Sequence, residues 1–477
     1  MQRLRRIVEE EVVLVVLMAA FATVFLLVFP PTLLVADSWL TLSVGREIVQ
    51  HGLPHHDHLT VLAAGRDWTD QQWGAQLLLY GAHELGGVPL VVLINAATVV
   101  GAFALAAAAA RNLGAGPASV LLVFFPVILA EPGAWTVRAQ VIALPLYVGL
   151  LWLLAAQASR PSRRVYLAFP LLVVWANLHG SVALGAMLTM LFGGLEIVRR
   201  SHLSLRQVLL VVVPPLLVLA TPYGPVATAR YYHLLLIDPP FKPSQVTEWT
   251  WSNPDWDTLV FYVLAALALV IVVRGHRRLT LFDGATLVLT FAGAVQAIRG
   301  IAWFAMACQV LLPVALGPLL EPRPTPIARR INVWLAGSAA AVLVAAVAFD
   351  FARDRSWYLQ HWPERAVAAV RESSGDGSRV FATDKNADWM LWRIPSLRGR
   401  LAYDVRFEIY STETFNRLVR FRGERGPDWK SLADGYRTLV LESNIKPSGV
   451  GVFRAEPGAR IRYRDDLVTV IERRAQS

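Results

Sequence analysis

Long apolar runs separated by short polar loops make up the first 350 residues of the chain. Crossing the hydrocarbon core of a bilayer takes about 20 predominantly apolar residues. Eleven runs are candidate spans: Val12–Ala36, Val88–Ala110, Ala118–Ala130, Ala139–Ala156, Val165–Ala176, Val182–Val198, Val208–Thr221, Thr258–Val273, Leu281–Ala297, Ile301–Leu320 and Ile331–Phe349. The third, fifth and seventh runs are short for a full crossing. The pattern predicts a mainly α-helical polytopic membrane protein with about 11 transmembrane helices.

The pattern changes at Asp350, after which the chain is polar with short apolar runs. Four of these runs have the length and composition of β-strands: Arg379–Thr383, Thr438–Leu441, Arg460–Tyr463 and Leu467–Ile471. Helical patterns lie between them at Pro363–Glu372 and Thr412–Phe421. We therefore predict a transmembrane domain over residues 1–350 and a small α/β domain over residues 351–477, which is long enough for a core of its own.

Charge is scarce, and its placement follows the predicted spans. Only 17% of the 477 residues are charged, against about 25% in a soluble domain. With the N-terminus in the cytoplasm, the inner segments hold sixteen arginines. The outer segments before residue 350 hold six basic residues: Arg46, Arg66, Arg138, Arg230, Lys242 and Arg299. Basic residues favour cytoplasmic loops, so the net charge of +10 indicates topology, not nucleic-acid binding, and the C-terminal domain is expected to be extracytoplasmic. The single cysteine, Cys308, excludes an intrachain disulfide.

The first outer loop, residues 37–87, is the loop richest in ionisable and aromatic groups. It begins at Asp37, where the first apolar run ends. A carboxylate at the end of a span is costly unless it lies in a wet cavity or has a partner. There it can accept a proton from a hydroxyl group as a general base. The alternative is an exposed loop aspartate just beyond the bilayer.

Two further groups lie in the same loop. The cluster His55, His56, Asp57 and His58 has residue types that hold divalent ions, and Asp57 with Asp37 is a candidate pair for one. Adjacent residues cannot all point at one centre, so we favour a solvated loop for the histidines. Asp67, Trp68, Asp70 and Trp73 follow, spaced as if on one face of a short interfacial helix. They are either an aromatic wall for a lipid or sugar ring, or ordinary interfacial tryptophans.

Cationic and polar groups recur on the outer side of later spans. Arg138 and Arg299 each precede a span, and His179 lies in the stretch W-A-N-L-H-G-S. Arginine suits paired recognition of phosphate oxygens, so we predict a phosphate pocket, with Lys242 in the long loop Pro222–Asp257 as a further candidate. Snorkelling to lipid headgroups is the alternative. The chain has no G-x-x-x-x-G-K-[ST] motif, so we do not expect it to use ATP as an energy source. It also has no CxxC or H-E-x-x-H motif.

The first loop carries a recognisable combination of segments. Asp37 at the end of a long run, then G-R-E-I, G-L-P-H-H-D and W-T-D-Q-Q-W, resembles the first outer loop of GT-C membrane glycosyltransferases. These include protein O-mannosyltransferases, aminoarabinose transferases and oligosaccharyltransferase catalytic subunits. Bacterial Rgt-like members similarly carry a W-A-N-L-H-G-type stretch and a C-terminal extracytoplasmic domain. Y-D-V-R-F-E-I-Y at 403–410 and Y-R-D-D-L-V-T-V-I-E-R at 463–473 also look like that group.

The resemblance implies a polyprenyl-phosphate-linked sugar as donor and transfer on the outer face of a bacterial inner membrane to a glycan, lipid or protein acceptor. Asp37 would be the catalytic base or a metal ligand, and Asp57 a second acid. Ser38 stands where the family often has another acid, which leaves open the use of Mg or Mn. A lipid phosphate is already a leaving group, so the reaction needs a base and positive charge for the phosphate. The expected substrate-binding residues are Asp57, Asp67, Trp68, Arg138, His179, Lys242 and Arg299.

Two alternatives from other functional classes remain open. One is a transporter or flippase of a lipid-linked saccharide, although the spans lack the mid-membrane charges typical of ion-coupled transport. The other is a catalytically silent scaffold that recruits cell-envelope enzymes through residues 351–477.

Overall fold

The computed structural model describes residues 11–130, 132–199, 203–317, 326–375, 377–443 and 449–474, without the side chains of residues 132, 326 and 327. Contacts divide the chain into two compact units. The first, which we call the helical unit, contains residues 1–29, 92–222 and 246–352. The second, the mixed unit, contains residues 30–91, 223–245 and 353–477. This division differs from the predicted boundary at residue 350, because most of the first outer loop belongs to the same unit as the C-terminal part. The arginines before residue 11 lie outside the described residues.

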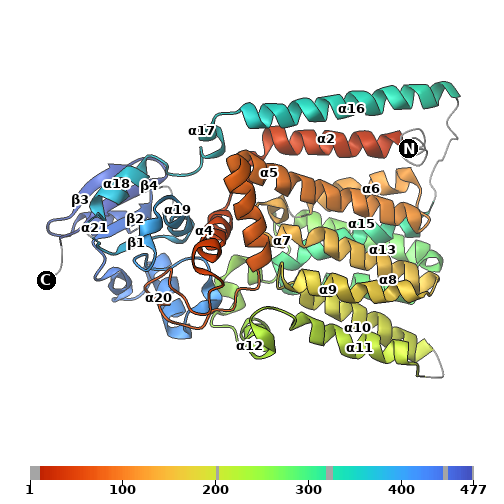
Figure 1. Ribbon diagram of the computed structural model, residues 1–477, viewed down its shortest axis with the longest axis horizontal. Helices are drawn as coiled ribbons and strands as arrows, with labels where there is room; N and C mark the ends of the chain where they lie inside the picture. Colours follow the sequence, from red (N-terminus) through yellow and green to blue (C-terminus); the bar gives the residue numbers. More distant parts are fainter. Residues whose placement is uncertain are drawn as a thin grey trace. The chain divides into compact units, whose positions relative to one another are not determined.

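The helical unit is a set of apolar helices (Figure 1). They are α2 (Val12–Val28), the later part of α5 (Trp73–Asn112), α6 (Pro117–Leu129), α7 (Ala139–Ile142), α8 (Leu144–Ser159), α9 (Ala168–Ala176), α10 (Val182–Arg199), α11 (Leu205–Val218), α13 (Leu259–Gly275), α14 (Leu281–Gln296), α15 (Ile301–Leu316) and α16 (Pro326–Ala352). Among the described residues, six helical segments are long and apolar enough to cross a membrane, and four shorter apolar helices accompany them. The chain is a multi-pass membrane protein.

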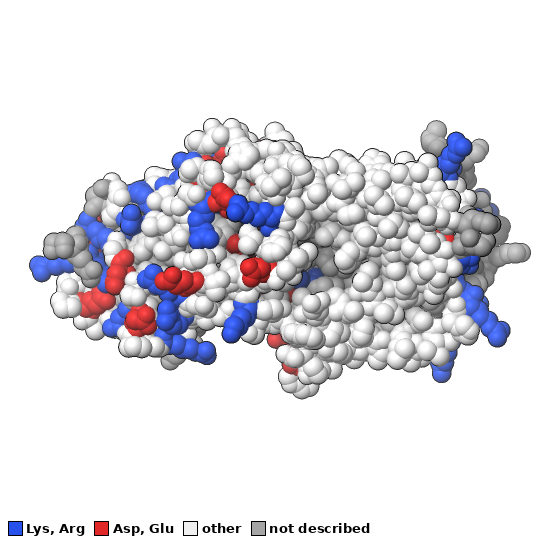
Figure 2. Space-filling view, turned by 90° about the horizontal axis from the view of Figure 1, so that it is seen from below, with Lys and Arg blue, Asp and Glu red and all other residues white. Residues whose placement is uncertain are grey.

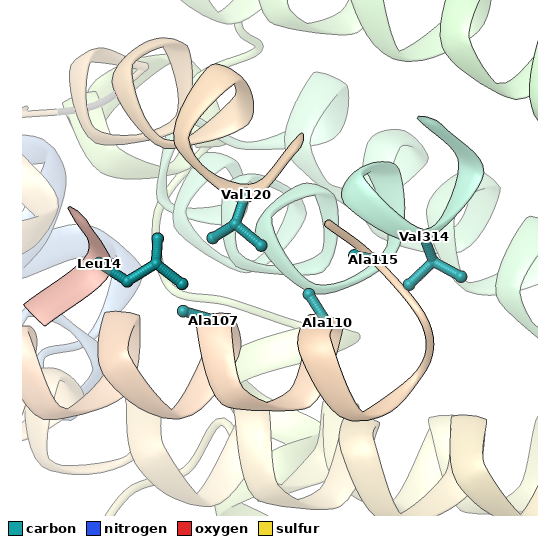
Figure 3. Close-up of a cluster of buried hydrophobic side chains, with 6 residues drawn as sticks. All are labelled: Leu14, Ala107, Ala110, Ala115, Val120 and Val314. Carbon is teal, nitrogen blue, oxygen red and sulfur yellow. The ribbon is translucent and has the colours of Figure 1, made fainter. Parts of the chain in front are cut away.

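Helix α15 lies at the centre of this unit. Its residues from Ile301 to Ala315 are all buried, and it packs against α6, α8, α13 and α14. At one end, Val314 joins a cluster of small and branched side chains from α2, α5, α6 and the loop before α6 (Figure 3). Small residues let helices approach closely where no hydrophobic effect drives them together. Figure 2 shows a broad face of this unit that is almost entirely free of charged residues, as lipid contact requires.

The first predicted span, Val12–Ala36, is wrong at its outer end. Helix α2 ends at Val28, and the short helix α3 (Pro30–Leu33) separates it from α4 (Ala36–His51). Proline lacks the amide hydrogen that a continuing helix needs, and its ring clashes with the preceding turn. Asp37 therefore lies in the first turn of a new helix, where the helix dipole favours a carboxylate.

The mixed unit contains a four-stranded sheet with helices around it. Its strands have the order β1-β2-β4-β3, with β1 parallel to β2 and the other neighbours antiparallel. The strands are β1 (Val380–Ala382), β2 (Thr438–Glu442), β3 (Arg460–Arg464) and β4 (Val468–Glu472). All four predicted strands are confirmed, as are the predicted helices at α18 (Ala366–Ser373) and α20 (Thr412–Arg422). Its other helices are α3, α4, the start of α5, α12 (Gly224–Leu236), α17 (Arg355–Tyr358), α19 (Asp384–Arg393) and α21 (Val450–Arg454).

Backbone hydrogen bonds join the first outer loop to the sheet region. The amides of Val61 and Leu62 donate to the carbonyls of Leu401 and Ala402 at 2.8 and 3.0 Å, and Leu401 in turn bridges to Val380 of β1. Helix α4 also lies against the start of α5. A Cβ at Gly45 would come within 2.5 Å of the carbonyl oxygen of Gln76, so only glycine permits this approach. The loop is thus an integral part of the mixed unit.

Candidate functional site

Helix α4, which carries Asp37, is fixed against α19 by aromatic packing and by a capping arginine. The ring of Trp39 lies 4.6 Å from that of Trp389 and 5.3 Å from that of Trp362. At the other end of α4, Arg46 donates to the carbonyls of Leu391 and Trp392 at 2.9 and 3.0 Å. These are the last carbonyls of α19, which a cation stabilises. The half-buried Asp37 is therefore held at a defined place beside α19.

A second aspartate, Asp388 on α19, lies near Asp37 and was not expected from the sequence. Asp388 is fully buried, and neither carboxyl oxygen has a hydrogen-bond partner in the described part of the chain. Burial raises the pKa of Asp388 well above its ordinary value, and the nearby Asp404 and Asp37 carboxyls raise it further. Burial raises the pKa of Glu408 as well, with Asp404 and Asp37 adding to the shift against the opposing effect of Arg406. Asp37 thus belongs to a group of acids, of which Asp388 and Glu408 hold protons more readily than ordinary carboxyls.

Arg406 is the cation of this group. It is 5% exposed and forms ion pairs with Asp404 and Asp57, the latter at 2.6 Å. Its guanidinium lies 4.0 Å from the ring centre of Trp68. Burial lowers the pKa of Arg406, but the carboxylates of Asp404 and Asp57 outweigh that cost and hold it well above the ordinary value. We call Arg406, Asp404 and Asp57 the buried ion network.

Asp57, predicted as a substrate or metal ligand, has its carboxylate engaged by other residues of the protein. Its carboxylate accepts hydrogen bonds from the Thr60 amide and hydroxyl at 3.1 and 2.7 Å as well as from Arg406. Burial would raise its pKa, but Arg406 and Thr60 outweigh burial and lower it. No group of three or more His, Cys, Asp or Glu residues within the described ranges is placed to hold a metal ion. Asp57 does not fit a divalent-cation site, and a cation at Asp37 remains a prediction.

The structure separates the other predicted residues of the mixed unit. Asp67 is exposed and pairs with Arg230 at 2.5 Å and with His56 at 3.3 Å. Trp68 is only 4% exposed, beneath Arg406. The expected short helix through these residues is wrong: Asp67 forms an antiparallel bridge with His56, and the chain is not helical before Trp73. Lys242 is exposed.

Asp70, next to Trp68 and also buried, has an unusual ionisation. Its Oδ1 accepts hydrogen bonds from the Gln72 amide at 3.0 Å and from the Gln76 side chain at 3.2 Å. Burial raises the pKa of Asp70 to about 7, although these hydrogen bonds and the charge of Arg406 oppose the shift. Asp70 is therefore a carboxyl that changes charge near neutral pH.

In the helical unit the structure brings together three of the predicted substrate-binding residues: Arg138, Arg299 and His179. Arg138 forms an ion pair with Glu248, and the guanidinium of Arg299 lies 4.6 Å from the ring centre of Trp249. Burial would raise the pKa of Glu248, but Arg138 and then Arg299 outweigh burial and lower it. Arg299 is also close enough to His179 to lower its pKa. We call Arg138, Arg299, Glu248 and His179 the arginine cluster.

His179 lies in this cluster as a neutral ring. Its Nδ1 accepts a hydrogen bond from the Ser181 amide at 3.1 Å, so the proton of the neutral ring is on Nε2. Burial and Arg299 lower the pKa of His179 to about 3. The Ser181 hydroxyl, which accepts from the Trp175 indole at 3.0 Å, lies 2.8 Å from the same Nδ1. His179 therefore offers an N–H donor and adds no charge.

No protein-family model matches the chain, and no curated protein matches it. Solved structures do match. The structure of ArnT from Cupriavidus metallidurans bound to undecaprenyl phosphate has a TM-score of 0.54 at 16% identity, over 96% of this chain and 97% of that one. The arabinofuranosyltransferase AftD from Mycobacteria has a TM-score of 0.51 at 14% identity, over 97% of this chain and 40% of that one.

The chain has the GT-C fold. The fold was expected from the first loop, and the match extends over nearly the whole chain. Asp37, Arg138, Arg299 and His179 were named from the sequence and stay predictions as site residues, whereas Asp388, Glu248 and Arg406 were not named as such. The segment that contains Asp404 and Arg406 was noted only for its resemblance to the family. The available signal was the D-V-R triplet, in which an acid and a base stand two residues apart between apolar neighbours.

Proposed function

We propose that the protein transfers a sugar from a polyprenyl-phosphate-linked donor to a hydroxyl of a glycan, lipid or protein acceptor on the extracytoplasmic face of the membrane. The GT-C fold supports this proposal, because the ArnT structure with which it is shared contains undecaprenyl phosphate. AftD, which shares it too, is named an arabinofuranosyltransferase. The observation that carries the proposal is the placement of Asp37 in the first turn of α4, among acids with raised pKa values.

Asp37 is assigned the role of general base. The acceptor oxygen attacks the anomeric carbon while the bond from that carbon to the phosphate oxygen breaks. The hydroxyl proton goes to the Asp37 carboxylate, and the polyprenyl phosphate leaves with the electron pair of the broken bond. Attack from the side opposite the phosphate inverts the anomeric configuration.

The arginine cluster is assigned the role of binding the phosphate. Two guanidinium groups face one carboxylate there, so the cluster has a surplus of positive charge. Fixed cations aimed at a departing phosphate stabilise the charge that develops on it. The N–H of neutral His179 is a further donor to phosphate oxygen. Asp57 and Trp68 are not assigned substrate roles, because the buried ion network accounts for their contacts.

The test is Asp37→Asn in the full-length protein, reconstituted in liposomes with undecaprenyl-phosphate-linked glucose, galactose or mannose. We expect transfer to fall at least 100-fold, since a positioned base contributes about 10² to 10⁴ in rate, while the thermal unfolding midpoint stays the same. Asp428→Asn, which removes an exposed carboxylate, is the control and should leave transfer unchanged. Wild-type transfer by Asp37→Asn would contradict the proposal. Movement of the donor across the bilayer without any acceptor would favour a flippase.

A further inference from the structure

The turn W-T-D-Q-Q-W, residues 68–73, buries polar atoms that the protein itself does not satisfy. Gln71 is 2% exposed, and neither its amide oxygen nor its amide nitrogen has a hydrogen-bond partner among the described residues. Asp70 and Gln76 are each 4% exposed. Within the same described set, Oδ2 of Asp70 and Oε1 of Gln76 also lack a partner. More than nine in ten buried polar groups in native proteins are paired, so several unpaired atoms in one turn call for an occupant.

These groups are held in place by the satisfied half of each side chain. The Gln76 amide nitrogen and the Gln72 backbone amide both donate to Oδ1 of Asp70. The carboxyl and the Gln76 amide therefore cannot rotate freely, and their remaining oxygens stay unpaired. Arg406 is close enough to act on the charge of Asp70, and its Nη1 has no partner in the described part of the chain. The turn therefore presents a fixed set of donors and acceptors.

The balance of donors and acceptors indicates the class of ligand. The unpaired acceptors are the amide oxygens of Gln71 and Gln76 and, in its ionised form, Oδ2 of Asp70. The unpaired donors are the Gln71 amide nitrogen and Arg406 Nη1. A hydroxyl group can donate to the unpaired oxygens and accept from the unpaired N–H groups. A phosphate carries only acceptors at neutral pH, and the oxygens of the turn would repel it. A compound with several neighbouring hydroxyls, such as a sugar, satisfies both kinds.

We infer that Asp70, Gln71 and Gln76, together with Nη1 of Arg406, form the subsite that binds the hydroxyl groups of the sugar being transferred. The inference rests on the proposed function, and it names the part of the mixed unit that recognises the sugar. Without a sugar the buried amide of Gln71 costs folding free energy, because it has lost water and gained no partner. Binding supplies the missing hydrogen bonds.

The test uses Gln71→Met in the full-length protein, because methionine has a similar size and no hydrogen-bonding amide. The adjacent Gln72→Met is the matched control, since Gln72 is half-buried and its side-chain amide is absent from the unpaired set. The probes are undecaprenyl phosphate alone and undecaprenyl-phosphate-linked glucose, galactose and mannose. Affinity is measured by native mass spectrometry, and the thermal unfolding midpoint is measured without ligand.

We expect Gln71→Met to keep or raise the ligand-free midpoint and to weaken binding of the sugar-bearing lipid that wild type prefers by about tenfold, the usual effect of losing one hydrogen bond. Affinity for undecaprenyl phosphate should stay the same, and Gln72→Met should behave as wild type.

Three outcomes would overturn the inference while leaving the proposed function standing. A lower ligand-free midpoint would show that the Gln71 amide has a structural partner. Equal weakening of the plain and sugar-bearing lipids would show an effect that is not specific to the sugar. Unchanged affinity for the sugar-bearing lipids would show that Gln71 does not contact the sugar. A wild-type protein that binds neither kind of lipid would contradict the proposed function, and the subsite with it.

Discussion

The buried ion network of the mixed unit and the arginine cluster of the helical unit both combine arginine with carboxylate, yet they differ in charge balance. In the network, one arginine, Arg406, pairs with two aspartates, and its side chain is 5% exposed. In the cluster, two arginines face Glu248, and the side chains of Arg138 and Glu248 are 27% and 39% exposed.

This difference separates a structural cation from a cation available to an anionic ligand. A buried arginine that is paired with two carboxylates has no net charge left for a further anion, although its Nη1 can still donate to a neutral hydroxyl, and removing it leaves buried charges unpaired. A partly exposed cluster with surplus positive charge loses little when one arginine is removed, but it can attract phosphate. Substitution of Arg406 should therefore lower stability strongly, whereas substitution of Arg299 should lower transfer with little loss of stability.

The largest loss of stability is expected from Arg406→Leu. The substitution leaves Asp57 and Asp404 buried without their cation, and breaking a buried ion pair in this way costs about 3–5 kcal/mol. The thermal unfolding midpoint of the full-length protein in detergent, followed by tryptophan fluorescence, measures the effect. Arg420→Leu is the matched control, because Arg420 and its partner Asp428 are both exposed and their charged atoms are as far as 3.8 Å apart. This substitution should lower the free energy of unfolding by less than about 1 kcal/mol. Equal losses for the two variants would contradict a structural role for Arg406.

A smaller, pH-dependent effect is expected from Asp70→Asn. The pKa of Asp70 is raised from 3.8 to about 7, so between these values the folded protein holds a proton that the unfolded chain has released. Stability therefore falls as pH rises through this range and is constant above it. One pKa unit corresponds to about 1.4 kcal/mol, so between pH 4 and pH 6 wild type should lose about 2 kcal/mol that Asp70→Asn does not lose.

The measurement for Asp70 is the unfolding midpoint of both proteins from pH 4 to pH 8. The two curves should converge at low pH and separate as pH rises, with the variant the more stable. Asp67→Asn serves as the comparison for charge removal in the same loop, since Asp67 is exposed. Parallel curves for wild type and Asp70→Asn would show that Asp70 is already ionised at pH 4, against the burial argument.

The elements that were predicted correctly are those that a local sequence pattern determines. Three of the four strands of the mixed unit follow short runs of β-branched and apolar residues, while β3 alternates arginine with Ile461 and Tyr463. Each strand was located to within one residue at either end. The end of α2 was missed, although Pro30 and Pro31 mark it. Helix α19 was also missed, although Thr383 and Asp384 at its start are ordinary helix-start residues; it packs against α4.

The partners within the candidate site could not be read from the sequence. Asp57 and Arg406 are 349 residues apart. Glu47, whose two carboxylate oxygens share the N–H of Arg398 Nε, is 351 residues from that arginine. Nothing in a local pattern says which distant arginine an aspartate meets. Asp57 was therefore predicted as a candidate ligand, whereas in the structure its carboxylate is engaged by Arg406 and Thr60. Arg138 and Arg299 were predicted as a pair because charge on the outer side of a span is visible in a single sequence.

The smallest loss of stability is expected from Arg299→Leu in the helical unit. Its contact with the Trp249 ring at 4.6 Å is worth about 1 kcal/mol or less, and the Arg138–Glu248 pair is left in place. If the arginine cluster binds the phosphate, transfer should nevertheless fall about 100-fold, the usual result of removing one group that stabilises developing charge. Transfer from the undecaprenyl-phosphate-linked sugar and the unfolding midpoint are measured on the same preparation, with Arg274→Leu, an exposed arginine of the same unit, as control. A loss of several kcal/mol with transfer unchanged would place Arg299 in the same class as Arg406, and charge balance would no longer distinguish the two regions.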